Sequence, residues 1–446
     1  MDISILISTQ ICLHTALPYI FELRKRNVAI HYIVAREVRE EASLLLKDAS
    51  SVVSIDILSR KHALAMLLHS FLRIVFTSQD YSPSYGRWLA QRFKHKNLII
   101  TVLLKWLIKF GPKWRREEIN QKLAYWIRKI LPNPFPTSRL INITATGDPH
   151  LLCARGLRVY TILESWDHPC KAPVGHSSER VFVWNDSLRK DWYEYQGDSN
   201  ISISYPIKLG YALNANKLKK TELIRSTHNR IMYSATFGAT SDSSLFNEEL
   251  RLIEEICKVT QDSGKKLLIK PKPNGTFGEL DQFLKFPHIE IGKYQHNRGG
   301  ANYHLSDEYN NNRLSELQTC DIVINLGTTF ALDAAAFGLP VVQLKIVCQQ
   351  HYPFLSTLTT FPHLARHFYS KPECIFTIAG SEPVSEELAF LGETSNYIQS
   401  AEAFSLYLRE WIMPNCTLEK SVANVVRACL GQKCTANLDD VKASQI

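Results

Sequence analysis

Residues 321–342 read Asp321-Ile-Val-Ile-Asn-Leu-Gly-Thr-Thr-Phe-Ala-Leu-Asp-Ala-Ala-Ala-Phe-Gly-Leu-Pro-Val-Val. The apolar run at 321–326 has the length and composition of a buried strand in a parallel sheet. Gly327-Thr328-Thr329 then opens a helix with hydroxyl groups where an N-cap is expected, and Gly338 and Pro340 end it before the next strand. This order predicts one strand–turn–helix–strand unit of a doubly wound α/β domain.

The turn in this unit is also a candidate anion site. A strand that ends in Gly327, Thr328 and Thr329 at the start of a helix presents backbone N–H groups and the positive end of the helix dipole to a ligand. Asp333 lies one turn further on, where it could accept hydrogen bonds from a ribose. The alternative interpretation is an ordinary strand–helix unit whose helix is well capped.

Two doubly wound domains are expected. The first starts with a strand at 3–8, a loop at 9–15, a helix at 17–25 and a second strand from Val28, and it contains no Gly-x-Gly-x-x-Gly. The second starts at Arg230, and Thr236 beyond its first strand is a further donor-binding candidate. We expect domains at 1–212 and 230–430, a polar linker at 213–229 and a tail at 431–446.

The densest ionisable cluster follows a predicted strand at 157–163. It reads Glu164-Ser-Trp-Asp167-His168, so two carboxylates and an imidazole lie within five residues beside a tryptophan. Such a setting can raise the pKa of a carboxyl group or orient a histidine, as a general base requires. The rival interpretation is a structural turn with capping side chains. His14, in the predicted first loop, is a second candidate, with a surface histidine as its alternative.

Lysines follow another predicted strand. The sequence Lys265-Lys-Leu-Leu-Ile-Lys270-Pro-Lys272-Pro-Asn places two lysines on a proline-stiffened loop at the carboxyl end of a strand. Such a loop suits a diphosphate, because parallel sheets place ligands at this edge. A solvated turn is the alternative.

The net charge of +9 comes from one segment. Residues 92–131 hold eleven basic side chains against Glu117 and Glu118, an excess that equals the net charge of the whole chain. This local excess does not favour nucleic-acid binding. Trp106, Phe110 and Trp114 lie among the lysines and arginines, which suits a helical insert at about 60–135 that contacts an anionic membrane. A domain helix with a solvated charged face is the alternative.

The remaining composition is that of a cytoplasmic globular protein. Hydrophobic residues make up 45% of the chain, and charged residues break every apolar run before it reaches membrane-spanning length. The start of the chain reads as a strand rather than a signal peptide. The ten cysteines include no Cys-x-x-Cys pair, which predicts buried, reduced thiols and no zinc site.

These features together resemble the GT-B glycosyltransferases, along nearly the whole chain. The segment that starts His14-Thr-Ala-Leu-Pro resembles the first loop and helix of that superfamily, and Arg180-Val-Phe-Val-Trp-Asn is similar to a strand of many members. Residues 327–340 are similar to its Gly-Ser-Thr, Glu-Ala, Gly-x-Pro donor signature, with Thr328 for serine and Asp333 for glutamate. The loop at 270–273 resembles a Lys-Pro-His-Pro loop with Lys272 in the place of histidine, which puts a histidine role there in doubt.

The resemblance implies a fold and a reaction. It implies two Rossmann-like domains that face a cleft, a nucleotide-sugar donor and a glycan or glycolipid acceptor. The donor diphosphate would lie over Gly327–Thr329 and the loop with Lys270 and Lys272. Glu164, Asp167, His168 or His14 would supply a base. No metal is expected, because helix dipoles and basic side chains offset the leaving-group charge.

The segment with Ser165, Trp166 and Asp167 also resembles a Ser-Trp-Asp turn in surface-polysaccharide transferases of this fold. The expected setting is therefore lipopolysaccharide or capsule synthesis at the inner membrane face. Four alternatives stay open. Three are enzymes: a polyol-phosphate transferase, a sugar-nucleotide epimerase, and a CMP-Kdo-type transferase for which Asp242 would be the nucleophilic carboxylate. The fourth is a catalytically silent scaffold subunit, which the lysine at 272 favours.

Overall fold

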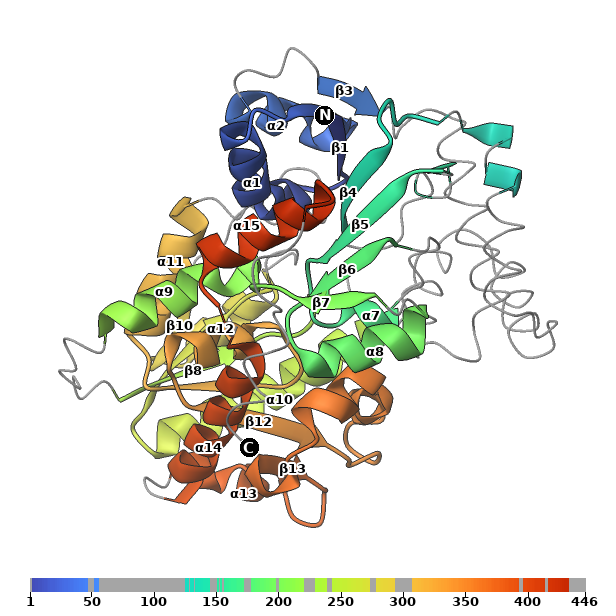
Figure 1. The fold of residues 1–446 in the computed structure, drawn as a ribbon. Helices are drawn as coiled ribbons and strands as arrows, with labels where there is room; N and C mark the ends of the chain where they lie inside the picture. Colours follow the sequence, from blue (N-terminus) through green and yellow to red (C-terminus); the bar gives the residue numbers. More distant parts are fainter. Residues whose placement is uncertain are drawn as a thin grey trace, which may run out of the picture. The chain divides into compact units, whose positions relative to one another are not determined.

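We describe the structure from a computed structural model, for residues 2–46, 52–55, 125–127, 129–131, 133–144, 151, 153–154, 156–171, 178–197, 200–219, 229–238, 243–272, 278–292, 307–392, 396–413 and 416–432. The chain forms two compact units (Figure 1). The first contains Met1–Lys208 and Pro414–Ile446, and the second contains Leu209–Met413. Each unit is built on a parallel sheet with flanking helices, which confirms the two predicted Rossmann-like domains.

The first unit has a seven-stranded sheet in the order β3-β2-β1-β4-β5-β6-β7. Its strands are β1 (Asp2–Ile7), β2 (Ala29–Ala35), β3 (Val52–Ile55), β4 (Arg139–Thr144), β5 (Arg158–Leu163), β6 (Arg180–Val183) and β7 (Ile201–Ile203). The central strands are buried almost throughout, as expected for a parallel sheet that is covered on both faces. The order reverses between β1 and β4, which makes the carboxyl ends of these strands the expected ligand edge.

The helices of the first unit begin and end at recognisable signals. They are α1 (Gln10–Lys25), η1 (Arg36–Val38), α2 (Arg39–Leu45), α7 (His168–Lys171), α8 (Asp186–Gln196), η3 (Ile207–Leu209) and α15 (Leu418–Cys429). The Thr9 side chain accepts from the amide of Cys12 and caps α1, and Asn185 caps α8 in the same way. Asn27 has a φ of 54°, so it ends α1 in the left-handed conformation that its short polar side chain tolerates.

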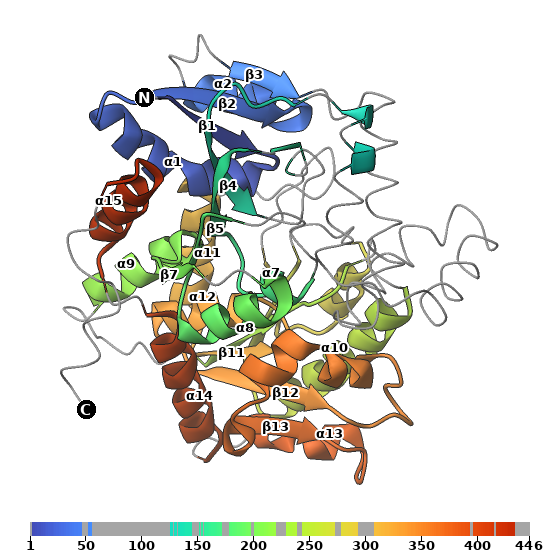
Figure 2. The same ribbon diagram turned by 45° about the vertical axis from the view of Figure 1, so that its right-hand side comes forward.

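The C-terminal helix belongs to the first unit. Val422, Val425 and Val426 of α15 join the same hydrophobic core as α1 and the β1 side of the sheet, and Figures 1 and 2 both show α15 beside α1. We predicted that the second domain runs to residue 430, so this helix corrects that boundary. The apolar face of α15 is visible in the sequence, but the surface it covers is not.

The second unit has a six-stranded sheet in the order β10-β9-β8-β11-β12-β13. Its strands are β8 (Arg230–Ser234), β9 (Lys266–Lys270), β10 (Ile289–Ile291), β11 (Ile322–Asn325), β12 (Val341–Ile346) and β13 (Ile375–Ile378). The strand at 321–326 and the one that starts at Val341 were predicted from the sequence and are confirmed. The order reverses between β8 and β11, and this reversal decides where the second unit is expected to bind a ligand.

Helices connect these strands. They are α9 (Gly210–Lys219), α10 (Ser243–Asp262), η4 (Leu280–Lys285), α11 (Asp307–Gln318), α12 (Phe330–Phe337), η5 (Leu355–Thr360), the π-helix η6 (Leu364–Phe368), η7 (Pro372–Cys374), α13 (Val384–Glu387), η8 (Ala389–Leu391) and α14 (Asn396–Ile412). Gly338 ends α12 with a φ of 94°, a conformation that favours glycine. The predicted linker was wrong over residues 213–219, which continue α9.

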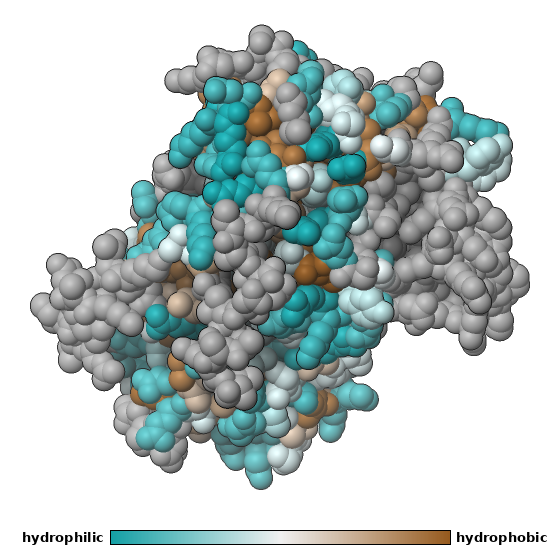
Figure 3. Space-filling model, in the orientation of Figure 1, coloured by the Kyte–Doolittle hydropathy of each residue, from teal (hydrophilic) through white to brown (hydrophobic). Residues whose placement is uncertain are grey.

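The surface and the thiols fit a globular protein. On the face shown in Figure 3, hydrophilic side chains cover most of the described surface and apolar ones form small, separate patches. Across the described ranges, no helix is both long and apolar enough to cross a membrane. Nine cysteines there are free, and all except Cys416 are buried, as predicted. Most of the predicted basic insert lies outside the described residues.

Candidate functional site

The strand register of the second unit brings three predicted segments to one edge. Ser234 at the end of β8 pairs with Lys270 on one side and with Asn325 on the other. The turn that starts at Gly327 and the loop that starts at Lys270 therefore flank the end of β8, although they are more than fifty residues apart in the chain. Because the strand order reverses here, this edge has the geometry at which α/β sheets bind ligands.

Side-chain hydrogen bonds fix the turn after β11. Asn325 Oδ1 accepts from the backbone N–H of Thr328 at 3.0 Å and from its hydroxyl at 2.7 Å. The Thr328 hydroxyl also lies 3.1 Å from that of Ser234 and accepts from the amide of Phe330 at 3.2 Å. Asn325 is itself held by a 2.7 Å bond from its Nδ2 to Gln343 on β12. The turn is therefore rigid, and its side chains already accept from the amide of Thr328 and from the first amide of the helix, that of Phe330.

Space beside Gly327 is tight. A Cβ at this position would lie 3.3 Å from Cδ1 of Leu364, the first residue of the π-helix. The hydroxyl of Tyr369 donates to the carbonyl of Leu326 at 3.3 Å from the end of the same segment. Single π-helical turns occur frequently at functional sites. The π-helix thus packs directly against the predicted donor turn.

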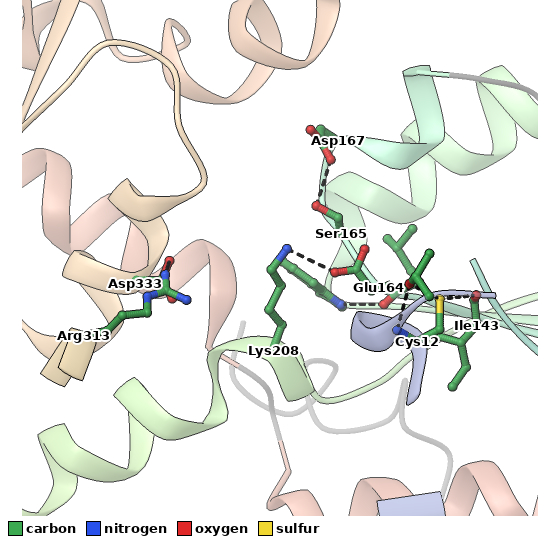
Figure 4. A network of polar contacts seen from close by, with 11 residues as sticks. Cys12, Ile143, Glu164, Ser165, Asp167, Lys208, Arg313 and Asp333 are labelled. Atoms are coloured by element: carbon green, nitrogen blue, oxygen red, sulfur yellow. Dashed lines mark hydrogen bonds and ion pairs between the residues drawn. The ribbon is translucent and has the colours of Figure 1, made fainter. Parts of the chain in front are cut away.

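Four buried charged residues near this edge form two ion pairs. Lys270 Nζ lies 2.5 Å from Glu316 Oε2, and Arg313 Nη2 lies 2.5 Å from Asp333 Oδ2. Tyr211 donates to the other oxygen of Asp333 at 2.7 Å. Figure 4 shows Arg313 and Asp333 pointing toward one another. Glu316 and Arg313 are one turn apart on α11, so this helix supplies a partner for both predicted ligands.

The same pairs constrain two predicted roles. Burial lowers the pKa of Lys270, while Glu316 opposes that shift. Asp333 is almost fully buried, so a ribose would reach it only if Arg313 or Tyr211 moved. Lys270 would likewise have to break its ion pair with Glu316 before it could contact a phosphate. Direct donor contacts by Lys270 and Asp333 stay predictions, and Lys272, which is half-buried, is the better placed lysine.

The loop after β8 is held by a carboxylate that the sequence did not single out. Glu249 accepts from the amides of Thr236 at 2.6 Å and Phe237 at 2.7 Å, and from the hydroxyl of Tyr233 at 2.9 Å. Burial raises the pKa of Glu249 to about 7, although the two amides, Tyr233 and Lys272 all favour the charged form. A helix position with an ordinary glutamate gives no sequence signal for this contact.

In the first unit, the predicted acidic cluster lies at the carboxyl end of β5. Glu164 is buried and its Oε1 lies 3.1 Å from Nζ of Lys208. Ser165 donates to Asp167 at 2.8 Å, and both side chains are buried. Figure 4 shows these contacts beside each other. Glu164 and Asp167 therefore lie at the strand end as predicted, and both carboxylates already have protein partners.

His14 has a different setting from the one predicted. Because Thr9 caps the first helix, α1 begins at Gln10 and His14 lies within it rather than in a loop. The expected loop at 9–15 was therefore wrong from Gln10 onward. His14 Nε2 lies 2.8 Å from Glu41 Oε1, a residue of α2 that the sequence analysis missed. A neighbouring carboxylate can hold an imidazole in one tautomer, which suits a general base.

Two predicted residues lie outside what the structure describes. Asp242 is not among the described residues, and of His168 only the backbone, at the start of α7, is described. Within the described parts of the chain, no group of three or more His, Cys, Asp or Glu side chains could hold a metal ion. The catalytic and donor-binding assignments of the remaining residues stay predictions.

Comparison with known proteins identifies the fold. No protein-family model and no curated protein matches the sequence. A solved structure from Listeria monocytogenes, which carries the name UDP-N-acetylglucosamine 2-epimerase, is similar over 98% of both chains at 9% identity, with a TM-score of 0.50. The UDP-GlcNAc 2-epimerase of Neisseria meningitidis bound to UDP-GlcNAc aligns at 12% identity and a TM-score of 0.49, over 97% of this chain and 99% of that one.

MurG from Acinetobacter baumannii aligns at 12% identity and a TM-score of 0.46, over 97% of this chain and all of its own. The inference about fold rests on the Listeria structure and on the two strand orders described above. Together they show that the chain has the GT-B superfamily fold, which the sequence motifs predicted.

Proposed function

We propose that the protein is a glycosyltransferase that takes its sugar from a nucleotide-sugar donor. The observation that carries the proposal is the polar edge of the second unit, where Ser234, Asn325 and Thr328 form one hydrogen-bonded network at the strand reversal. Hydroxyl groups, the N-terminal end of α12 and Lys272 suit a diphosphate, because each favours negative charge. The fold likeness to a protein named as a UDP-N-acetylglucosamine 2-epimerase supports the same class of ligand.

His14 is the proposed general base of the first unit. In the reaction, an acceptor hydroxyl loses its proton to the imidazole, its oxygen forms a bond to the anomeric carbon, and the nucleotide leaves with the electrons of the broken bond. Glu41 would hold the ring in one tautomer and stabilise the imidazolium that forms. We favour His14 over Glu164, because Glu164 is engaged by Lys208.

The proposed acceptor is a glycan or glycolipid at an anionic membrane surface. The described end of the basic segment supports this proposal. Tyr125 and Trp126 are 56% and 52% exposed, and Lys129 Nζ lies 4.4 Å from the centre of the Tyr125 ring. Exposed aromatic rings beside lysines are typical of segments that lie in the headgroup region. Co-sedimentation with vesicles should need anionic lipid and weaken in Trp126→Ala.

Calorimetry with UDP-, GDP-, dTDP-, CDP- and CMP-sugars tests the donor assignment. At least one donor should bind, and with an acceptor the mixture should release nucleoside phosphate and a sugar-bearing product. If none of them binds, the proposal is wrong. An epimerase is the second candidate, since proteins of that name share the fold. It would interconvert two nucleotide sugars and would transfer no sugar to an acceptor.

A further inference from the structure

Two adjacent glutamates on α10 hold two separate loops. Glu249 accepts from the amides of Thr236 and Phe237, in the loop that follows β8. At the start of η5, Glu248 accepts from the amide of Phe354 at 2.9 Å and from that of Leu355 at 2.7 Å. Both carboxylates are buried. Glu248 and Glu249 therefore each bind backbone amides of a different loop, and of the two only Glu249 contacts the loop that follows β8.

The loop held by Glu249 borders the proposed donor edge. Ser234, the last residue of β8, contacts Thr328 through its hydroxyl, and the next residue donates its amide to the carbonyl of Lys270 at 3.0 Å. Thr236 is itself buried. Two amides, one buried and one partly buried, donate to one carboxylate and leave the backbone little freedom, because each would be costly to leave without an acceptor. The path of residues 235–238 thus depends on Glu249.

We propose that Glu249 is a positioning residue for the donor, whose carboxylate keeps the loop at 235–238 in the conformation that binds the nucleotide sugar. This inference rests on the proposed function. A carboxylate offers both oxygens as acceptors, and charge-assisted bonds to amides are the strong kind. Protonation turns one oxygen into a hydroxyl group, which is a weaker acceptor and removes the charge that strengthens both amide bonds. Protonation therefore weakens the hold on the two amides and loosens the loop.

The surroundings of Glu249 place this change near neutral pH. Its pKa is about 7, because burial outweighs the groups that favour its charged form. Those groups are the two loop amides, the hydroxyl of Tyr233 on β8 and the ammonium of Lys272 after β9. The pKa of Tyr233 is raised well above its ordinary value, chiefly by burial and by the neighbouring Glu249, with a smaller contribution from Tyr352. Tyr233 consequently stays a hydrogen-bond donor to Glu249.

Donor binding and proton binding should then be coupled. If the ionised form binds the donor, the affinity falls by up to about tenfold for each pH unit below the pKa, since the competent fraction falls by that factor. Coupling is reciprocal, so donor binding should release a proton at pH values near and below the pKa. Simple repulsion between the Glu249 carboxylate and the donor phosphates would instead cause proton uptake.

Isothermal titration calorimetry of the full chain measures both quantities. The probe is the nucleotide diphosphosugar that binds in the screen above, because both of its phosphates are diesters and carry no proton near neutral pH. Titrations from about pH 5.5 to about pH 8.5, in buffers of different ionisation enthalpy, give the affinity and the protons released. The wild type should lose affinity below neutral pH and release protons there.

Three variants make the test specific. Glu249→Gln mimics the protonated group, so its affinity should match the low-pH limit of the wild type, with no proton release near neutral pH. Glu248→Gln is the matched control and should keep the wild-type pH profile. Tyr233→Phe removes a hydrogen bond that lowers the Glu249 pKa, so it should move the midpoint of the profile to higher pH. It also keeps the test decisive if the glutamine variant does not fold.

The outcomes separate the two proposals. If no nucleotide sugar binds the wild type, the proposed function is wrong and this inference falls with it. If a donor binds, but Glu249→Gln keeps the wild-type pH profile or Tyr233→Phe leaves its midpoint unchanged, only the role of Glu249 is overturned. Proton uptake on binding would also overturn it. A profile that Glu249→Gln flattens and Glu248→Gln preserves supports it.

Discussion

Substitution of Asp333 by Asn removes one charge from the buried cluster of the second unit and keeps the shape of the side chain. The amide oxygen can still accept from Tyr211, so the loss is confined to the ion pair with Arg313 at 2.5 Å. Arg313 and Asp333 are both buried, so the guanidinium would be left without its counter-charge. Arg313 also disfavours the charged form of Lys270, which shows that the two cations repel one another.

The expected cost is large. Breaking a buried ion pair by removing one partner costs about 3–5 kcal/mol, and we expect the lower end because the Tyr211 bond survives. For a unit of about 200 residues, each kcal/mol lowers the melting temperature by roughly 2–4 °C. Asp333→Asn should therefore lower the free energy of unfolding by about 3 kcal/mol and the melting temperature by roughly 6–12 °C.

Urea denaturation of the full chain, followed with calorimetric melting, measures this loss. The matched control is Glu255→Gln in the exposed pair with Lys258, whose side chains are 27% and 49% exposed at an N–O distance of 2.8 Å. That pair should contribute less than about 1 kcal/mol, because exposed ion pairs gain little in water. A cost for Asp333→Asn that equals the control would refute the reasoning that the buried charges depend on one another.

A double replacement separates stability from function. Arg313→Met with Asp333→Leu removes both charges, and such replacements are often neutral or stabilising. The double variant should therefore recover most of the stability that Asp333→Asn loses. If the double variant also binds the donor, the ion pair has a structural role only. If it is stable but does not bind the donor, one of the two residues contacts the donor. A double variant as unstable as the sum of the single ones would contradict the ion-pair explanation.

Three further outcomes are expected. Gly327→Ala places a Cβ 3.3 Å from Cδ1 of Leu364, which should destabilise by about 1–3 kcal/mol and weaken donor affinity. Leu364→Ala is itself costly because Leu364 is buried, but Gly327→Ala should cost less in that background than in the wild type, as thermal melting and calorimetry would report. His14→Asn should lower kcat by about 10²–10⁴-fold without changing donor affinity, whereas Glu41→Gln should have a smaller effect in the same kinetic assay. Because burial raises the pKa of Glu249 from 4.5 to about 7, the stability that its protonated form contributes is full below about pH 4.5 and is lost as the pH rises through about 7. Urea titrations at several pH values should show this fall in the free energy of unfolding for the wild type and not for Glu249→Gln.

The sequence predicted the local units well, because their signals lie within a few residues. The strand at 321–326, the glycine that ends α12 and the strand after Pro340 are all present. The two doubly wound domains followed from the alternation of strands and helices and from the resemblance to a known superfamily. Parallel pairing then brought Ser234, Lys270 and Asn325 to one edge, which periodicity alone does not reveal.

Contacts between distant segments could not be predicted. Lys270 looked like a phosphate ligand because it begins a proline-stiffened loop at the carboxyl end of a strand. Its partner Glu316 is 46 residues away on α11. Glu41 likewise pairs with His14 only because α2 and α1 pack on the same side of the first sheet. A charged residue in an ordinary helix gives no sign of such a partner, so the sequence favoured the residues whose local setting was unusual.

The cluster of four charges changes the expected origin of donor affinity. Lys270 and Arg313 are balanced by Glu316 and Asp333, so together they present no net charge to a diphosphate. In the proposed function, the attraction for the donor would then come from the hydroxyl groups and the helix end at this edge and from Lys272, whose charge Glu249 partly offsets. Buried pairs of this kind fix geometry more than they supply energy. The second unit is thus better suited to hold a donor in one orientation than to capture it by charge.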